Sequence, residues 1–185
     1  MKEKLLLHIC CGPCSLYVWR KLQTDFAVSG FFYNPNIQPF AEHEFRRREL
    51  VKIAEKYAWP VVYAPVDLHD WFAAISGLEK EKERGARCPV CFRFRLEKTF
   101  RHAREHGFDV VASTLSISPS KATAQINEQG YALAEKYGIA FLAENFKKQD
   151  GFLISRREGQ ALGVRRQDYC GCAFSKAEML LRRRH

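Results

Sequence analysis

The sequence predicts a doubly wound, Rossmann-like α/β domain in which helices cover both faces of a parallel sheet. Apolar runs of strand length alternate along the chain with stretches whose apolar residues recur at three- and four-residue spacing. Strand alternating with helix is the pattern of a parallel sheet buried on both sides. The chain has 185 residues, 46% of them hydrophobic, and shows neither an internal repeat nor a linker-like segment. We therefore expect one domain over residues 1–185, large enough to bury its own core.

The expected elements follow from this periodicity. Five short apolar runs, rich in branched and aromatic residues, are predicted to be strands: residues 5–9, 28–33, 61–64, 110–113 and 140–142. Four stretches of helical periodicity are predicted to be helices: residues 16–22, 43–57, 93–106 and 126–137. Gly107 and Gly138 stand where helix C-caps belong. Residues 77–87, rich in Glu, Lys and Gly, are expected to form an exposed excursion.

Polar and cysteine-rich sequences follow the predicted strands, where loops lead into helices. The sequence CCGPCS follows the first strand and NPN follows the second. Asp67 comes after the third strand, and SISPSK follows the fourth. Ligands of doubly wound sheets bind beyond the carboxyl ends of the strands. We therefore expect the functional site at this edge.

Seven cysteines form three groups: Cys10, Cys11 and Cys14, then Cys88 and Cys91, then Cys170 and Cys172. A domain of this size needs no disulfide framework, and an odd number of cysteines cannot pair completely. A dithiol oxidoreductase needs two cysteines and a tetrahedral zinc needs four, whereas seven could hold a four-iron cluster with three left over. The alternative for a single cysteine is an ordinary buried side chain. The grouping favours a metal site at the carboxyl ends of the strands.

The charge of the chain suits a polyanionic partner. Thirty Lys and Arg against 21 Asp and Glu give a net charge of +9. The cations gather at residues 46–48, 147–148, 156–157, 165–166 and 182–184. A basic surface attracts nucleic acid without specifying its sequence. Any single cluster could instead be a solvated helix face, which is the interpretation that we favour for residues 182–184.

The N-terminal sequence MKEKLLLHIC superficially matches a secretory signal, because lysines precede an apolar run. The run of leucines ends at His8, whereas a signal core needs about seven to fifteen apolar residues. No later segment approaches the roughly twenty apolar residues of a membrane-spanning helix. We therefore expect a cytoplasmic protein without a membrane partner, where thiols stay free for metals.

The motifs together resemble the epoxyqueuosine reductase QueH family. The sequences that carry the resemblance are HICCGPCS, GFFYNPNIQP, GARCPVCFRFRLEKT, STLSISPSK, NFKKQDGF and RRQDYCGCAFS. They follow the order and spacing of that family over nearly the whole chain. Departures occur at Gln38, where the family commonly has His, and at Val164 and Arg165, where it commonly has Leu and Tyr. None of these positions is a cysteine.

The resemblance implies an α/β metalloenzyme that removes the epoxide oxygen of epoxyqueuosine at the wobble position of tRNA, giving queuosine. It also implies a 4Fe-4S cluster with an additional mononuclear iron. All seven cysteines are candidate metal ligands, and we expect Cys10, Cys11, Cys88 and Cys91 to bind the cluster. Spacing alone leaves the assignment of sulfurs open, and Cys170 and Cys172 either ligate metal or form a redox disulfide. We expect the segment 151–185, which carries this pair, to pack back onto the site.

Other residues at the strand exits are candidates for catalysis and recognition. Asp67 is a candidate catalytic carboxylate, as metal ligand or proton donor, and a helix N-cap is an equally weighted alternative; Asp70 is the weaker competitor. Candidate contacts to tRNA are Tyr33, Asn34, Asn36, Ser116, Ser118, Arg165 and Arg166. Further candidates are Lys121, Arg46, Arg47 and Arg95, with Phe32, Phe92 and Tyr169 as stacking surfaces, although core positions are expected for most of these aromatics. We interpret His8 as an ordinary half-buried histidine.

Three rival hypotheses are open to test. An ATP-dependent tRNA thiolase would share a PP-loop-like (HUP) sheet, but the CCGPC loop lacks the consecutive glycine amides that cradle a pyrophosphate. A zinc-stabilised RNA-binding module without catalytic activity would be colourless, whereas a cluster protein is brown. A thiol–disulfide oxidoreductase would be active without metal. Because no flavin or nicotinamide site is apparent, we expect an external electron donor of the ferredoxin or flavodoxin type.

Overall fold

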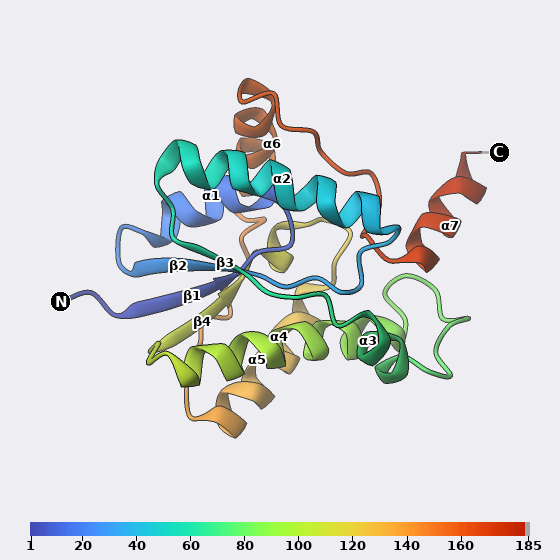
Figure 1. The fold of residues 1–185 in the computed structure, drawn as a ribbon, viewed down its shortest axis with the longest axis horizontal. Helices are drawn as coiled ribbons and strands as arrows, with labels where there is room; N and C mark the ends of the chain where they lie inside the picture. Colours follow the sequence, from blue (N-terminus) through green and yellow to red (C-terminus); the bar gives the residue numbers. More distant parts are fainter. Residues whose placement is uncertain (184–185) are drawn as a thin grey trace.

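The architecture is a parallel sheet between two layers of helices. A computed structural model describes residues 1–183 and contains a five-stranded parallel sheet in the order β3-β2-β1-β4-β5 (Figure 1). The strands are β1 (Lys4–His8), β2 (Ala27–Phe32), β3 (Val61–Tyr63), β4 (Val110–Ser113) and β5 (Ala140–Phe141). The chain leaves β1 toward β2 on one side and returns to β4 on the other. This reversal of strand order lies beside β1, where doubly wound folds bind their ligands.

Helices cover both faces of the sheet (Figure 1). One layer holds α1 (Gly12–Leu22), α2 (Phe40–Tyr57) and α6 (Gly151–Ala161). The other holds α4 (Arg87–Glu105) and α5 (Thr123–Tyr137), with the short α3 (Leu68–Ala74) beside α4. A 3-10 turn, η1 (Thr114–Ile117), follows β4, and α7 (Ala173–Arg182) stands apart at the carboxyl edge of the sheet. The carboxyl edge is therefore framed by the starts of α1 and α4 and by the C-terminal segment.

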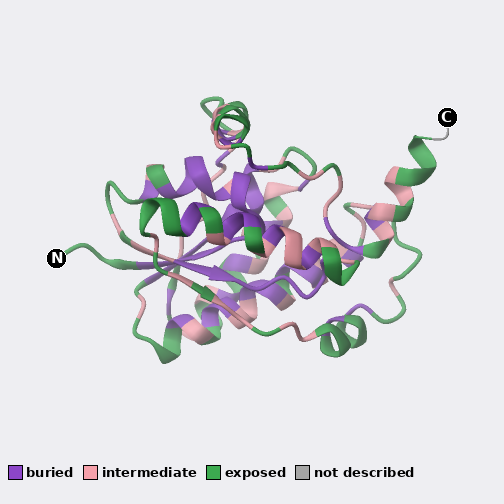
Figure 2. Cartoon of the chain, turned by 45° about the horizontal axis from the view of Figure 1, so that its top comes forward, coloured by how far each residue is buried: buried purple, intermediate pink, exposed green. Residues whose placement is uncertain are grey.

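Alternate residues of β1 divide the core between the two layers. Leu5, Leu7 and Ile9 pack with α1, whereas Leu6 packs with apolar residues of α4 and α5. The central strands are buried on both faces, and the exposed residues of α2, α4 and α5 lie on their outer sides (Figure 2). Burial of both faces explains why β1 and β4 are unbroken apolar runs in the sequence.

The predicted strands and helices are confirmed, with shifted boundaries. Gly138 is the left-handed C-cap of α5, and Gly107 follows the C-cap of α4, as expected. The predicted start of the third helix at residue 93 was wrong, because α4 begins at Arg87. Cys88 and Cys91 therefore lie on the first turns of a helix. Residues 77–86 are largely exposed, as expected, but Arg87 at the end of that range is buried.

The C-terminal segment, residues 162–183, is attached to the domain by polar contacts and by a small apolar cluster, in which Cys172 and Phe174 pack with Trp71 and Ile75. Arg46 of α2 donates to the carbonyls of Tyr169 and Cys170, at 3.4 and 3.2 Å. The amide of Gln38 donates to the carbonyl of Gly171 at 2.7 Å, and the Tyr169 hydroxyl donates back to the carbonyl of Gln38 at 2.7 Å. Residues 184–185, which end the expected domain and the terminal arginine cluster, lie outside the described residues. Within residues 1–183, no helix combines the length and apolarity that crossing a membrane requires.

Candidate metal centre

The first cysteine group occupies the loop between the central strand and α1. β1 ends at His8, and α1 begins at Gly12, with Pro13 in its first turn and Cys11 as its N-cap. A Cβ atom on Gly12 would lie 2.9 Å from Cδ1 of Ile53 and 3.3 Å from the carbonyl carbon of Glu49. Glycine therefore allows α1 and α2 to approach closely at this point. The loop is buried, and its position is set by the sheet and by two helices.

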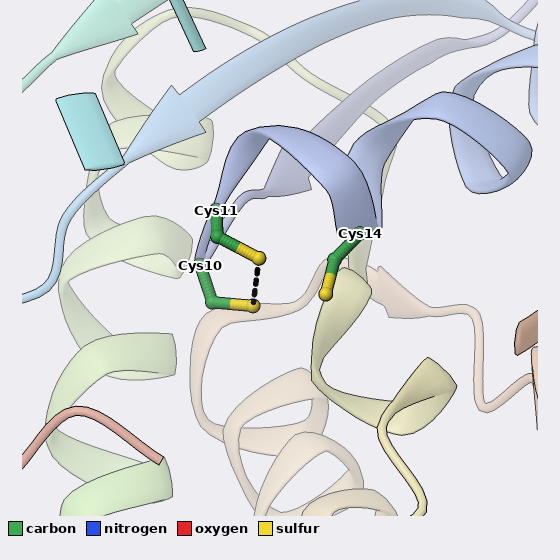
Figure 3. A group of neighbouring side chains, drawn as sticks. All are labelled: Cys10, Cys11 and Cys14. Atoms are coloured by element: carbon green, nitrogen blue, oxygen red, sulfur yellow. Dashed lines mark hydrogen bonds between the residues drawn. The ribbon is translucent and has the colours of Figure 1, made fainter. Parts of the chain in front are cut away.

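The three sulfur atoms of this loop point toward one another (Figure 3). The Sγ atoms of Cys10, Cys11 and Cys14 all lie within 4.8 Å of one another, and those of Cys10 and Cys11 are 3.9 Å apart. The Thr114 hydroxyl donates to Sγ of Cys10 at 3.4 Å and accepts from the amide of Cys10 at 3.1 Å. Thr114 belongs to η1, after β4, so the two strand exits at the point of reversal jointly hold Cys10.

Hydrogen bonds among the three thiols shift their pKa values in opposite directions. Hydrogen bonds from the thiols of Cys11 and Cys14 hold the pKa of Cys10 well below its ordinary value, although burial opposes the shift. The hydrogen bond with Cys10 raises the pKa of Cys11 to about 12 and also raises that of Cys14 well above its usual range. A cation bound among the sulfurs would favour the thiolate form of all three. The group can therefore act as a compact thiolate ligand set.

The second cysteine group lies at the start of α4. The amide of Arg84 donates to Sγ of Cys88 at 3.2 Å, and burial raises the pKa of Cys88 to about 11. Arg87, between this amide and the body of the helix, donates to the carbonyls of Leu78 and Glu79 at 3.2 and 3.0 Å. The buried guanidinium thus anchors the exposed excursion to the helix that carries Cys88 and Cys91.

The third group, Cys170 and Cys172, flanks a strained glycine. Gly171 has φ 129°, and a Cβ atom there would meet Cγ1 of Ile37 at 3.0 Å. Cys172 is the N-cap of α7, and its Sγ accepts from the amide of Ser175 at 3.4 Å. The fixed turn at Gly171 holds the two cysteines on either side of a sharp bend. Both are free thiols in this structure, as are the other five.

The three groups converge electrostatically on two buried cations. Burial lowers the pKa of Arg95, but the thiolates of Cys91, Cys170 and Cys10 outweigh it and raise the pKa. The pKa of Lys121 is likewise raised, because Cys170, Cys10 and Cys14 outweigh its burial. Each cation therefore interacts with more than one cysteine group. Packing agrees with this, because Cys88 packs against the cluster that holds Cys10 and Cys11, Cys91 packs with Cys172, and Cys170 shares a cavity wall with the first group.

A cavity of about 690 Å³ opens beside the cysteines. Its wall includes the first cysteine group and Cys170, together with Ser118, Ser120, Gln160 and Gln167. Its charged residues are mostly cations: Arg46, Lys121, Arg156, Arg166, Arg182 and Arg183, against Glu83 and Asp168. The site thus joins a group of thiols to a positively charged hollow built by α6, α7 and the segment between them.

Several predicted recognition residues are buried behind this surface. Tyr33, Asn34 and Asn36 are almost fully buried, and Asn34 donates to the carbonyl of Ile9 at 2.9 Å. Ser116 is buried as well, and its hydroxyl donates to the carbonyl of Glu144 at 2.7 Å. Of the predicted residues after β4, Ser118 and Lys121 line the cavity. Burial places most of these side chains where they support the site from within.

Of the predicted residues Asp67, Arg165 and Arg166, only Arg166 lines the cavity. Asp67 is the N-cap residue of α3, and its carboxylate accepts from the Tyr33 hydroxyl at 2.9 Å and from Lys98 at 3.1 Å. It is not among the described residues that line the cavity. Arg166 lines the cavity, whereas Arg165 points to an ion pair with Glu42, their atoms 2.7 Å apart.

His8 and Arg95 are more deeply buried than the sequence predicts. His8 is fully buried, and burial followed by the charge of Arg95 lowers its pKa to about 3, so it is neutral and more buried than expected. Arg95 was expected to contact tRNA but lies inside the domain. Thr114, whose hydroxyl holds Cys10, was missed, although its place directly after a predicted strand was the available signal.

The chain was then compared with known proteins. The family model described as epoxyqueuosine reductase QueH matches residues 5–178. The chain belongs to the epoxyqueuosine reductase QueH family. The QueH protein of Histophilus somni is 42% identical over 181 residues, covering 94% of this chain and 72% of the relative. That of Thermotoga maritima is 36% identical over 178 residues, covering 94% of this chain and 91% of the relative. QueH proteins are oxidoreductases of queuosine biosynthesis, so the chain is a member of an enzyme family.

Solved structures confirm the predicted fold class of this QueH chain. The U34-tRNA thiolase NcsA from Methanococcus maripaludis, with its 4Fe-4S cluster, gives a TM-score of 0.58 at 15% identity, and the match covers 96% of this chain and 64% of that chain. A predicted subunit of tRNA methyltransferase from Methanocaldococcus jannaschii gives 0.55 at 11% identity, covering 82% and 74%. At such identities the likeness concerns the fold alone, a Rossmann-like α/β domain of the PP-loop type.

Proposed function

We propose that this chain reduces the epoxide of epoxyqueuosine, at the wobble position of tRNA, to give queuosine. The names of its relatives support this activity. The structural observation that carries the proposal is the group of Cys10, Cys11 and Cys14, with the other two cysteine groups packed nearby, beside a cavity lined by cations. Thiols are suited to a redox cofactor, and a basic hollow is suited to the phosphates of an anticodon loop.

The proposed reaction consumes two electrons and two protons. Both C–O bonds of the epoxide break, a carbon–carbon double bond forms, and the oxygen leaves as water. Because no ordinary side chain donates electrons, a cofactor must supply them. A cysteine-bound 4Fe-4S cluster and an additional mononuclear iron would supply single electrons and a Lewis acid. We propose that an external donor of the ferredoxin or flavodoxin type restores the electrons.

The residues present fit such a cofactor. Four thiolates hold a four-iron cluster, and the proposed four are Cys10, Cys11, Cys88 and Cys91. The additional iron is then left to Cys14, Cys170 and Cys172, unless Cys170 and Cys172 instead form a redox disulfide. Within residues 1–183, Nη2 of Arg95 and Nδ2 of Asn36 are buried without a hydrogen-bond partner. Buried donors of this kind require an acceptor, and the sulfurs of a cluster accept hydrogen bonds.

The cations of the cavity are the proposed tRNA contacts. Arg156 and Arg166 approach from α6 and the segment after it, and Arg182 and Arg183 approach from α7. Ser118, after β4, offers a hydroxyl to a phosphate. We propose that these groups hold the anticodon loop while the modified base enters the cavity. Arg165, Ser116, Tyr33, Asn34 and Asn36 then act by supporting this surface.

We propose that residues 151–185 belong to the same domain as the rest of the chain and pack back onto the site.

Asp67 is the candidate proton donor. The Asp67 carboxylate accepts a hydrogen bond from the Tyr33 hydroxyl. The carbonyl of Tyr33 lies 3.1 Å from Nε2 of His8, at the end of β1. An Asp67→Ala protein should turn over more slowly with unchanged iron content. Full turnover with full iron would remove Asp67 from the mechanism.

The test begins with anaerobically purified protein. Iron, sulfide and zinc content, with a visible and EPR spectrum, decide whether a reducible cluster is present, and iron in excess of sulfide supports the additional iron. The loaded protein is then given tRNA bearing epoxyqueuosine and a chemical reductant, and the nucleosides are analysed by mass spectrometry. Conversion to queuosine supports the proposal. Zinc without sulfide after reconstitution, or a reducible cluster without conversion, would overturn it, and the first outcome would favour the RNA-binding module.

A further inference from the structure

Two buried cations beside the cysteines lack a carboxylate partner. Arg95 is 1% exposed and Lys121 is 8% exposed. Elsewhere in this region buried arginines are compensated: Nε of Arg46 lies 2.9 Å from Oε1 of Glu42, and Arg87 lies 4.0 Å from Glu178. Over residues 1–183, no carboxylate oxygen lies within 4.0 Å of Arg95 or Lys121. Burying an unpaired charge is costly, so an anion is required nearby.

The hydrogen bonds of Arg95 do not supply that anion. Its Nε donates to the carbonyl of Cys91 at 3.3 Å, and its Nη1 donates to Oδ1 of Asn34 at 3.4 Å. Both bonds are long and both acceptors are neutral, while Nη2 has no partner among the described residues. A guanidinium has five donors, and here most of them have weak partners or none. The arrangement is incomplete without a further, negatively charged group.

Both charges lie beside thiols. Nε of Arg95 donates to the carbonyl of Cys91, one turn earlier on α4, and Lys121 shares the cavity wall with Cys10, Cys14 and Cys170. The negative charges of Cys91, Cys170 and Cys10 also raise the pKa of Arg95 against its burial. Lys121 follows β4 and precedes α5. A four-iron cluster with four thiolates is an anion, and reduction adds one more negative charge to it. Fixed positive charges in a low-dielectric site stabilise the more negative state most strongly.

We propose that Arg95 and Lys121 are positioning residues whose charges compensate a cysteine-bound iron–sulfur cluster and make it easier to reduce. This inference rests on the proposed function, because it requires the cluster. It assigns Arg95 to the cofactor and not to tRNA. It also explains why a lysine and an arginine are buried beside thiols without an acidic partner.

The test is a redox titration of the loaded protein, followed by its EPR or visible spectrum. Arg95→Gln and Lys121→Gln should each shift the midpoint potential to a more negative value, whereas Arg95→Lys should stay close to wild type because it keeps the charge. Arg101→Gln is the matched control, since it removes an exposed arginine of the same helix and should leave the potential unchanged. Unchanged potentials in both Arg95→Gln and Lys121→Gln would overturn the inference.

A second measurement separates this role from a structural one. In the metal-free protein Arg95 lacks its anion, so Arg95→Met should unfold at a higher urea concentration than metal-free wild type. A lower concentration for Arg95→Met, with an unshifted potential for Arg95→Gln, would mean that Arg95 serves packing alone. Absence of any cluster in the wild type would instead refute the proposed function, so the two failures are distinguishable.

Discussion

The first and last cysteine groups differ in what holds them. Cys10 and Cys11 follow the central strand, and the surrounding β1, α1 and η1 are packed on an apolar core. Cys170 and Cys172 lie on a segment held by backbone carbonyls that accept from Arg46 and Gln38, and by a small apolar cluster of Cys172, Trp71, Ile75 and Cys91 that is separate from the main core. A polar attachment opens at lower free energy than an apolar core. The comparison teaches that the first cysteine group is part of the packed core, whereas the last group lies on a segment that can detach at lower free energy.

The largest expected effect is a loss of iron when a cysteine of the first group is replaced. Cys11→Ala should lower iron retention more than about 100-fold, because changes of residues that merely support ligands already cost 10–100-fold. Cys172→Ala should keep most of its iron, since the preformed group remains intact. Iron and sulfide per chain after anaerobic reconstitution measure both. Equal losses would show that the last group is as essential to the cluster as the first.

The next effect concerns the stability of the two regions. Leu7→Ala, in the centre of β1, should lower the free energy of unfolding by about 2–5 kcal/mol, because it leaves a cavity between packed layers. Leu181→Ala, at a 60% exposed position of α7, should change it by less than about 0.5 kcal/mol. Urea denaturation of the metal-free proteins compares them. A similar cost at both positions would contradict the contrast between core and attached segment.

A smaller effect is expected where the two regions meet. Arg46→Met removes the donors to the carbonyls of Tyr169 and Cys170 and the ion pair with Glu42, and should cost about 2–3 kcal/mol. Backbone amides of residues 165–172 should exchange with solvent faster. Arg47→Met is the matched control, because its more exposed pair with Glu44 contributes less than about 1 kcal/mol. Unchanged exchange in Arg46→Met would show that another contact fastens the segment.

The smallest effect tests a single hydrogen bond. Tyr169→Phe removes the hydroxyl that donates to the carbonyl of Gln38 at 2.7 Å, and should cost about 1 kcal/mol. Urea denaturation gives the change in stability, and hydrogen exchange near Cys170 should increase less than in Arg46→Met. A larger increase than in Arg46→Met would reverse the order of importance that the contacts indicate.

The sheet and its long helices could be predicted because apolar burial leaves a periodic signal. Of the missed helices, α3 has seven residues and buries one large apolar side chain, whereas the fully buried residues of α6 and α7 are small. The buried residues of α6 are Gly151, Ser155 and Gly159, and α3 and α7 bury Trp71 and Ser175 respectively. The hydroxyl of Ser155 donates to the carbonyl of Pro13, so polar and small residues join α6 to α1. Such contacts carry no hydrophobic periodicity.

The sequence predicted the place of the cysteines in the fold better than that of the cations, and their role as metal ligands stays a prediction. The grouping of the thiols identified the carboxyl edge, because each group adjoins a strand exit or a helix start. Arg95 was assigned to tRNA because charge in a sequence normally indicates the surface. Arg95 is instead buried, and its Nη1 donates to Oδ1 of Asn34, which only folding brings close to it.

Helix α4 connects the cofactor site to the interior of the protein. Its first turns carry Cys88 and Cys91, and its following turns insert Leu96, Phe100 and Ala103 into the core beneath the sheet. A rigid helix moves as one body, so a slight slide of these apolar side chains would displace both sulfurs. The amount of iron that the protein retains should therefore report on how tightly its interior is packed. If the proposed cluster is bound, a variant loosened far from the cysteines should release it before it loses its helices.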